Sequence, residues 1–209
     1  MGVRPPRIGV VHRATGRTSL APFIRADGSA PARWQTRVEL AWDEDRLSVH
    51  FHCSDDDAWG TYTERDAPLW QQEVVELFLA AGEAVPARYF EFEVSPAGVL
   101  FDALVGNPHG DRIGLTVDPA WNCPGIEWGA EPTRERADWR AHLAIPWRGL
   151  DLAAPPATLR ANFYRIERPR AGEPEAVCAA QRAIYHVQRN IEDVQSARFP
   201  GRILLCDRG

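Results

Sequence analysis

The sequence predicts an all-β protein, namely a single-domain, two-sheet antiparallel β-sandwich. Apolar residues recur at every second position over many short segments, which is the spacing of half-buried strands. Turn-forming residues separate these segments, and no segment keeps a helical period. The 17 prolines and 16 glycines are spread along the chain and form no linker. Residues 1–209 are therefore predicted to form one domain, with an N-terminal strand and lead-in over residues 1–30.

The first two long strands are expected to form a hairpin around the acidic turn Asp43, Glu44 and Asp45. Aspartate side chains accept hydrogen bonds from the backbone of such turns. On each flanking strand apolar residues alternate with polar ones, so that one face of the hairpin is apolar. The apolar residues are Val38, Leu40 and Trp42 before the turn and Leu47, Val49, Phe51 and Cys53 after it.

The other expected strands are also short and are bounded by turn residues. A second hairpin turns at residues 95–98, where proline and glycine favour a tight turn. A third strand is an apolar run that contains a single carboxylate, Glu76. The full set of further strands is expected at residues 8–11, 74–79, 89–94, 99–105, 113–117, 126–131, 139–145, 159–167 and 203–206.

Composition excludes several kinds of function. The net charge of −5 argues against a nucleic-acid partner. Every basic residue is an arginine, which rules out a phosphate loop or a Schiff base that depends on lysine. The only methionine is Met1, so no internal methionine is present to hold a haem iron. No apolar stretch has the length of a signal peptide or a membrane span, so we expect a soluble cytoplasmic protein with no membrane partner.

The four cysteines are too far apart in sequence to form a zinc-type pair. Their spacing favours buried free thiols, although two disulfides are also compatible with it. They are Cys53, Cys123, Cys178 and Cys206.

The stretch from residue 62 to residue 79 is the most informative for function. It places Trp70 in a polar loop and Glu76 within the strand that follows. An aromatic ring covers the apolar C–H face of a sugar, and a carboxylate accepts hydrogen bonds from its hydroxyl groups. The stretch therefore predicts a sugar-binding site. The alternative is that Trp70 is a lid over the edge of the sandwich.

Further carboxylates are expected beside Glu76. Glu91 and Glu93 alternate with apolar residues on their strand, so they would share a face with Glu76 if the two strands lie in one sheet. Clustered carboxylates repel unless a cation pairs with them. Arg165, which lies with Glu167 on the strand expected at residues 159–167, is a candidate for the compensating positive charge. The alternative interpretation is a structural ion-pair network on a solvated sheet face.

Metal binding is only weakly indicated, and we expect no cofactor. The acidic run Asp55 to Asp57, with Asp66, offers ligands that calcium prefers, although a solvated turn explains it as well. His50 and His52 share a strand face, but no third ligand is identified by its spacing.

Several motifs, taken in order, resemble those of family 9 carbohydrate-binding modules. The opening hairpin with Asp55, the Leu69-Trp70 to Leu79 stretch and the strand pair ending in Ser95-Pro96-Ala97-Gly98 each resemble a landmark of that family. Residues 139–146 and the Phe199-Pro200-Gly201 approach to the last strand follow in the expected order. The likeness covers roughly residues 32–206 and is greatest to stand-alone bacterial proteins of this type.

This resemblance implies a β-sandwich related to the DOMON superfamily. It also implies a site that holds the end of a sugar chain between two tryptophans, beside a glutamate. Trp70 and Glu76 match the first tryptophan and the glutamate. No tryptophan occurs at residues 190–194, where the second is expected. Glu93 and Ser95 stand where the family's binding members carry an arginine and an asparagine.

The function expected from the sequence is non-catalytic binding of a mono- or oligosaccharide, in the context of carbohydrate catabolism. Trp70 would stack on the sugar and Glu76 would accept its hydroxyl groups, with Glu91, Glu93 and Arg165 as further site residues. A glycoside hydrolase that uses two of the glutamates is the alternative. A DOMON-type redox module and a purely structural role are further alternatives, while the nucleophile motif Gly-x-Ser-x-Gly is absent.

Overall fold

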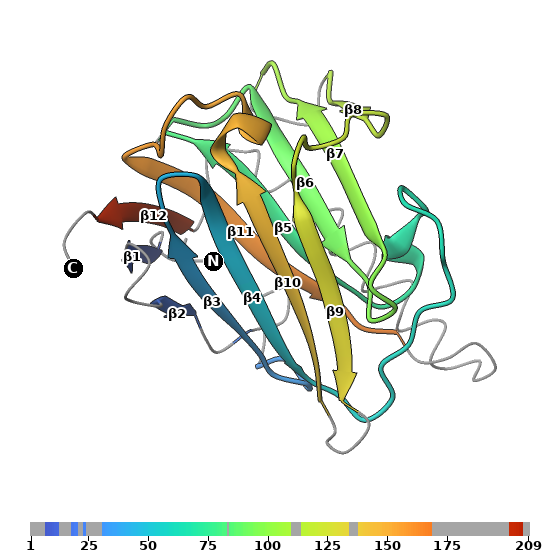
Figure 1. Cartoon of the computed structure of the whole chain (residues 1–209). Coiled ribbons are helices and arrows are strands. Elements are labelled where there is room, and N and C mark those ends of the chain that lie inside the picture. The colour runs from blue at the N-terminus through green and yellow to red at the C-terminus, as the bar shows by residue number, and fades with distance from the viewer. Residues whose placement is uncertain are drawn as a thin grey trace, which may run out of the picture.

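The computed structural model describes residues 7–12, 18–20, 23, 31–82, 84–109, 114–133, 138–168 and 201–206. These residues form two sheets that face each other (Figure 1). One sheet has seven strands in the order β1-β12-β11-β5-β6-β7-β8, and the other has five in the order β2-β3-β4-β10-β9. The strands are β1 Arg7–His12, β2 Thr18–Leu20, β3 Thr36–Trp42, β4 Arg46–Ser54, β5 Val74–Ala81, β6 Arg88–Val94, β7 Leu100–Gly106, β8 Thr116–Asp118, β9 Glu127–Thr133, β10 Asp138–Pro146, β11 Thr158–Ile166 and β12 Gly201–Cys206.

The predicted all-β sandwich is confirmed, with one departure from an antiparallel arrangement. β1 pairs with β12 in parallel, from Arg7 opposite Gly201 to His12 opposite Cys206. The helical elements among the described residues are two short 3-10 helices, η1 (Leu69–Gln71) and η2 (Trp147–Leu150). None of these described helices is long and apolar enough to cross a membrane.

The first predicted hairpin is present as β3 and β4. Leu40 lies opposite Val49, and buried residues alternate with partly exposed ones along both strands. The Asp43 side chain closes the turn, because it accepts hydrogen bonds from the backbone N–H groups of Asp45 at 2.8 Å and Arg46 at 2.9 Å. The apolar face and the turn predicted for this segment are therefore both confirmed.

The main core lies between the inner faces of the two sheets. It contains large side chains with no exposed surface, such as Phe51, Phe92 and Trp139. Burying one such side chain stabilises the fold by about 1.5–3 kcal/mol. Cys53 and Cys123 lie in this core as free thiols, as predicted. Burial raises the pKa of both thiols to about 12. Cys178 lies outside the described residues, as does the Cys206 side chain.

Strand β5 is buried on both faces rather than on one. Val75, Leu77 and Leu79 face the main core, as predicted. The outer face of the same sheet carries two smaller apolar clusters, one around Val74 and Phe101 and the other around Phe78 and Tyr89. The carboxylates of β5 and β6 lie on this outer face, which we call the carboxylate face.

Candidate functional site

The carboxylate face is built on four neighbouring strands, β11, β5, β6 and β7. Glu76 on β5 lies directly opposite Tyr164 on β11 and Glu93 on β6, and Glu93 lies opposite Phe101 on β7. Side chains directly opposite each other on paired strands lie on the same face. Tyr164, Glu76, Glu93 and Phe101 therefore form one row across the sheet.

Glu91 belongs to the same face, because it is two residues before Glu93 on β6. Its neighbours across the sheet are Phe78 and Ala103. The carboxyl group of Glu93 lies within hydrogen-bond reach of both Glu76 and Glu91. The structure thus brings together the three glutamates that the sequence suggested for one face.

The three carboxyl groups are in an unfavourable place for negative charge. Glu76 and Glu93 are each 1% exposed, while Glu91 is partly exposed. Burial raises the pKa of Glu76 and of Glu93 well above the usual value, and the charges of neighbouring glutamates raise both further. Burial also raises the pKa of Glu91 to about 7. The group therefore holds protons at neutral pH that separate glutamates would have lost.

Two oxygens of this group receive no hydrogen bond from an N–H or hydroxyl group of the described residues. Oε2 of Glu76 and Oε2 of Glu93 are buried without a hydrogen-bond partner in the structure. No ion pair between described residues reaches any of the three glutamates. Buried polar atoms without partners are rare in native proteins. A proton shared between neighbouring carboxyl groups, or a donor from a ligand, can satisfy these oxygens.

Trp70 stands at the edge of the row. It belongs to η1, and its ring packs edge-on against Phe101, with 5.2 Å between ring centroids and 78° between planes. Its backbone carbonyl accepts a hydrogen bond of 2.8 Å from Nη2 of Arg168. The ring is partly exposed. Phe101 and Glu93 therefore connect a partly exposed indole to the buried carboxylate of Glu76.

Arg165 does not compensate the three glutamates, contrary to the expectation from the sequence. It lies opposite Val75, a core residue, so it is on the other face of the sheet from Glu76. Its guanidinium donates to the carbonyl oxygen of Ser54 at 2.7 Å and pairs with the Asp55 carboxylate. Arg165 follows Tyr164 directly in the strand, and successive strand residues point to opposite faces. Since Tyr164 shares the face of Glu76, Arg165 cannot.

A second acidic group surrounds Arg165, and sequence reasoning missed one of its members, Glu73. Glu73 is 3% exposed, and its Oε2 accepts the backbone N–H of Trp59 at 3.2 Å. Burial raises the pKa of Glu73 to about 9, with the charge of Asp55 as the next cause. Glu167 lies 3.9 Å from Arg165. Glu73 follows two glutamines in sequence, so only its position just before a strand hinted at burial.

The residues suggested as metal ligands either bind other residues or do not lie together in one group. Asp55 pairs with Arg165 and also accepts the N–H of Asp57 at 2.9 Å, so the acidic run does form a turn. The turn is solvated only in part, because Asp56 and Asp57 are exposed whereas Asp55 is buried. Among the described residues, no group of three or more His, Cys, Asp or Glu side chains is arranged to hold a metal ion. Calcium binding stays a prediction.

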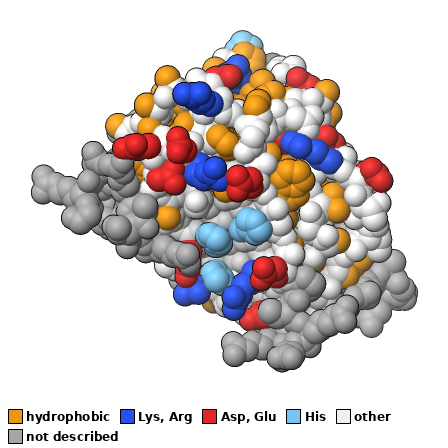
Figure 2. All heavy atoms as spheres, viewed as in Figure 1, with side chains coloured by type: hydrophobic (Ala, Val, Ile, Leu, Met, Phe, Trp, Pro, Cys, Tyr) orange, Lys and Arg blue, Asp and Glu red, His pale blue; other side chains and the backbone are white. Residues whose placement is uncertain are grey.

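The outer face of the five-stranded sheet carries a group of histidines with charged residues around it (Figure 2). The rings of His50 and His142 are stacked with 6.2 Å between centroids. Nε2 of His52 lies 3.6 Å from Oε2 of Glu39. This face is on the opposite side of the sandwich from the three glutamates.

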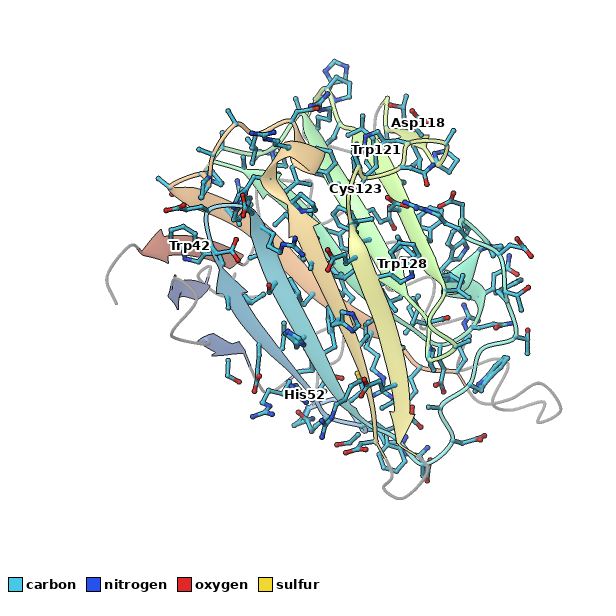
Figure 3. The ribbon with its side chains drawn as sticks, viewed as in Figure 1. Trp42, His52, Asp118, Trp121, Cys123 and Trp128 are labelled. Carbon is cyan, nitrogen blue, oxygen red and sulfur yellow. The ribbon has the colours of Figure 1, made fainter. Side chains whose placement is uncertain are left out.

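Two further tryptophans are associated with β9: Trp121 precedes the strand and Trp128 belongs to it (Figure 3), and both are partly buried against the main core. Trp121 packs on Phe90 with 5.0 Å between ring centroids. Trp128 donates from its indole N–H to the carbonyl oxygen of Gly98 at 3.2 Å, and the Arg65 guanidinium lies 5.2 Å from its ring centroid. Both contacts are structural, so Trp70 is the tryptophan of interest on the carboxylate face.

Comparison with known proteins gives one sequence relative and several structural ones. No protein-family model matches the sequence. A protein of Arthroderma benhamiae named "Extracellular protein" is 27% identical over 165 residues, which covers 73% of this chain and 74% of the relative. The region of residues 190–194, where a second tryptophan was expected, lies outside the described residues.

Three solved structures share the fold over 97% of this chain. A proposed carbohydrate-binding protein of Bacteroides uniformis has a TM-score of 0.64 at 13% identity, with 99% of its chain covered. A family 9 carbohydrate-binding module of Caldicellulosiruptor kristjanssonii, in complexes with cellotriose and with glucose, has a TM-score of 0.53 at 15% identity, with 95% and 97% of its chain covered. The chain therefore has the fold of family 9 carbohydrate-binding modules.

Proposed function

We propose that this protein binds a carbohydrate without modifying it, on the carboxylate face. The observation that carries the proposal is the row formed by Phe101, Glu93 and Glu76, which joins the partly exposed ring of Trp70 to buried carboxyl oxygens that no described N–H or hydroxyl group reaches. Support comes from the shared fold, since the module of Caldicellulosiruptor kristjanssonii forms complexes with cellotriose and glucose.

The role proposed for each residue follows from the chemistry of a pyranose. Its axial C–H groups present an apolar face, which the Trp70 ring would cover. Its hydroxyl groups are donors, and the Oε2 atoms of Glu76 and Glu93 are acceptors that no described N–H or hydroxyl group reaches. One aromatic platform buries only one face of the sugar, so we expect a dissociation constant between micromolar and millimolar, about −4 to −8 kcal/mol.

Calorimetric titration with glucose and cellotriose tests the proposal. Wild type should bind at least one of them, Trp70→Ala should weaken binding at least tenfold, and Glu76→Gln should weaken it as well. Trp34→Phe is the matched control, because Trp34 is partly exposed but precedes β3 in the other sheet. Absence of binding to any mono- or oligosaccharide would refute the proposal, as would equal affinities of wild type and Trp70→Ala.

Glycoside hydrolysis is the second candidate, and one observation favours it. The pKa of Glu91 is raised to about 7, which suits a general acid. Against it, Glu93 is within hydrogen-bond reach of both other glutamates, whereas the two carboxyl groups of glycosidases stand roughly 5–9 Å apart. Turnover of chromogenic glycosides that is lost in Glu76→Gln would establish the hydrolase instead.

A further inference from the structure

Trp70 lies on a helix that is too short to hold its own position. η1 has three residues, and no side chain caps its N-terminus at Pro68. A single 3-10 turn is unfavourable by itself, because it fixes several backbone dihedral angles for few, poorly aligned hydrogen bonds. The indole ring packs edge-on against Phe101, which does not fix the backbone of η1. The position of the ring therefore depends on contacts that hold η1 from outside.

Gln72, the residue after η1, binds Thr61 with both ends of its side-chain amide. Its Oε1 accepts the backbone N–H of Thr61 at 2.7 Å, and its Nε2 donates to the Thr61 hydroxyl oxygen at 2.7 Å. A backbone N–H group can only donate, so the first contact identifies the oxygen end of the amide. Each polar end of the Gln72 side chain thus has a partner within the chain.

The residues on either side of Gln72 contact the same earlier segment. The Tyr62 hydroxyl group donates to Oε1 of Gln71 at 3.0 Å. Oε2 of Glu73 accepts the backbone N–H of Trp59 at 3.2 Å. Residues 71, 72 and 73 therefore bind residues 62, 61 and 59, so the two segments run in opposite directions. We call this set of contacts the brace.

The earlier segment of the brace is attached to the sandwich at two points. A Cβ atom on Gly60 would lie 3.5 Å from Cβ of Ala97, so the segment packs on the turn between β6 and β7. The indole N–H of Trp59 donates to the carbonyl oxygen of Arg168 at 2.7 Å. Nη2 of Arg168 in turn donates to the carbonyl oxygen of Trp70 at 2.8 Å. The brace therefore connects η1 to a strand turn and to the chain that follows β11.

We propose that Gln72 and Thr61 are positioning residues for sugar binding, because their paired hydrogen bonds hold Trp70 where its ring stacks on the ligand. The inference rests on the proposed function and adds to it two residues that act through Trp70. A ring that is in place before binding does not have to be ordered by the ligand. Loss of the paired hydrogen bonds lowers the fraction of molecules with the ring in place, and the apparent dissociation constant rises in inverse proportion.

Calorimetric titration of the full chain with glucose and cellotriose tests the proposal. Gln72→Ala should weaken binding about threefold to tenfold, the range expected when one side chain must be ordered on binding. Thr61→Val removes the hydroxyl group and keeps the N–H group, so it should have a smaller effect in the same direction. Thr61→Ser keeps both groups and should retain wild-type affinity.

Stability separates positioning from a general structural role. The contact between Gln72 and Thr61 is at the surface, so these variants should melt within about 3 °C of the wild type. Asn122→Ala is the matched control, because it removes another exposed side-chain hydrogen bond, from Nδ2 to the carbonyl oxygen of Ala120 at 3.1 Å. It should change neither the affinity nor the melting temperature.

A double-mutant cycle separates positioning from direct contact with the sugar. Once Trp70 is replaced by alanine, Gln72→Ala should weaken binding no further, because the two substitutions act on one stacking contact. Quenching by acrylamide gives a second measure, with the Trp70 signal taken as the difference between each protein and its Trp70→Phe counterpart. Gln72→Ala should make Trp70 easier to quench, and this measurement decides the matter if Trp70→Ala binds too weakly to titrate.

The outcomes distinguish the inference from the function on which it rests. Wild-type affinity in Gln72→Ala, or unchanged quenching of Trp70, overturns the inference and leaves sugar binding intact. A further loss of affinity on adding Gln72→Ala to Trp70→Ala also overturns it, in favour of a direct contact between Gln72 and the sugar. Failure of the wild type to bind any mono- or oligosaccharide overturns the proposed function, and the inference with it.

Discussion

Arg65 holds the buried carboxylate of Asp102 with two groups of its guanidinium. Nε lies 3.1 Å from Oδ1, and Nη2 lies 2.7 Å from Oδ1 and 2.9 Å from Oδ2. Asp102 is fully buried on β7, and its Oδ2 also accepts the backbone N–H of Cys123 at 2.7 Å. One carboxylate therefore connects the loop before β5, which carries Trp70, to the segment before β9.

Asp102→Asn should destabilise the protein, because it leaves Arg65 with only its longer ion pair, at 3.9 Å to Asp66, and removes an acceptor. Removing one member of a buried pair costs about 3–5 kcal/mol, and we expect about 2–4 kcal/mol because the Arg65 side chain is 32% exposed. Urea unfolding monitored by fluorescence measures the change. Asp151→Asn is the control: its ion pair with Arg88 has side chains 53% and 70% exposed, and its loss should cost at most about 0.5 kcal/mol. Equal losses in the two variants would contradict the prediction.

The buried carboxyl of Glu73 should make stability fall as pH rises. Its pKa in the folded protein is about 9, above the ordinary value of an unfolded glutamate, so the folded state binds a proton more tightly. The stabilising effect is fully present below the unfolded pKa and is lost as pH rises through about 9. The slope reaches about 1.4 kcal/mol per pH unit between these values.

Glu73→Gln should flatten this pH dependence, because an amide is neutral throughout and keeps an acceptor for the Trp59 N–H. Free energies of unfolding measured at pH 5, 7 and 9 check the prediction. The free energy of unfolding of the variant should rise relative to that of the wild type as pH increases, with the largest relative rise at pH 9. Glu64→Gln, at an exposed position of the same loop, is the control and should run parallel to the wild type. Parallel curves for Glu73→Gln and the wild type would show that Glu73 titrates normally.

Gly149 should not tolerate a side chain. A Cβ atom there would lie 2.6 Å from Sγ of Cys123 and 2.9 Å from the carbonyl oxygen of Pro124. Overpacking of this kind costs about 1–3 kcal/mol, so Gly149→Ala should lower the melting temperature by roughly 2–12 °C. Gly60→Ala is the matched control, since its Cβ would have ordinary contacts of 3.5 Å or more. Calorimetry showing equal melting temperatures for the two variants would contradict this account of η2 packing.

The alternation of residue types was sufficient to predict much of the fold. The hairpin of β3 and β4 followed from period two and from Asp43, because both signals are local. The shared face of Glu91 and Glu93 followed in the same way, since both lie on one strand. The burial of β5 on both faces was not predicted, although its almost continuous apolar run is typical of central strands.

Features that depend on pairing between distant strands could not be predicted. Whether Arg165 and Glu76 lie on the same face depends on the register in which β11 pairs with β5. Neither strand's own sequence specifies that register. The burial of Glu73 likewise depends on what packs over a polar-looking loop. The shortening of β8 to Thr116–Asp118, against an expected strand at residues 113–117, reflects the weak pairing signal of a short edge strand.

The parallel pairing of β1 with β12 has a mechanical consequence. Arg7 lies beside Gly201, and His12 lies beside Cys206, so the start of β1 and the end of β12 are at opposite ends of the pair. A force that pulls Arg7 and Cys206 apart is directed along both strands. It strains all the hydrogen bonds of the pair together, in shear, instead of opening them one after another from one end. The two ends of the described chain thus meet in a junction that resists stretching.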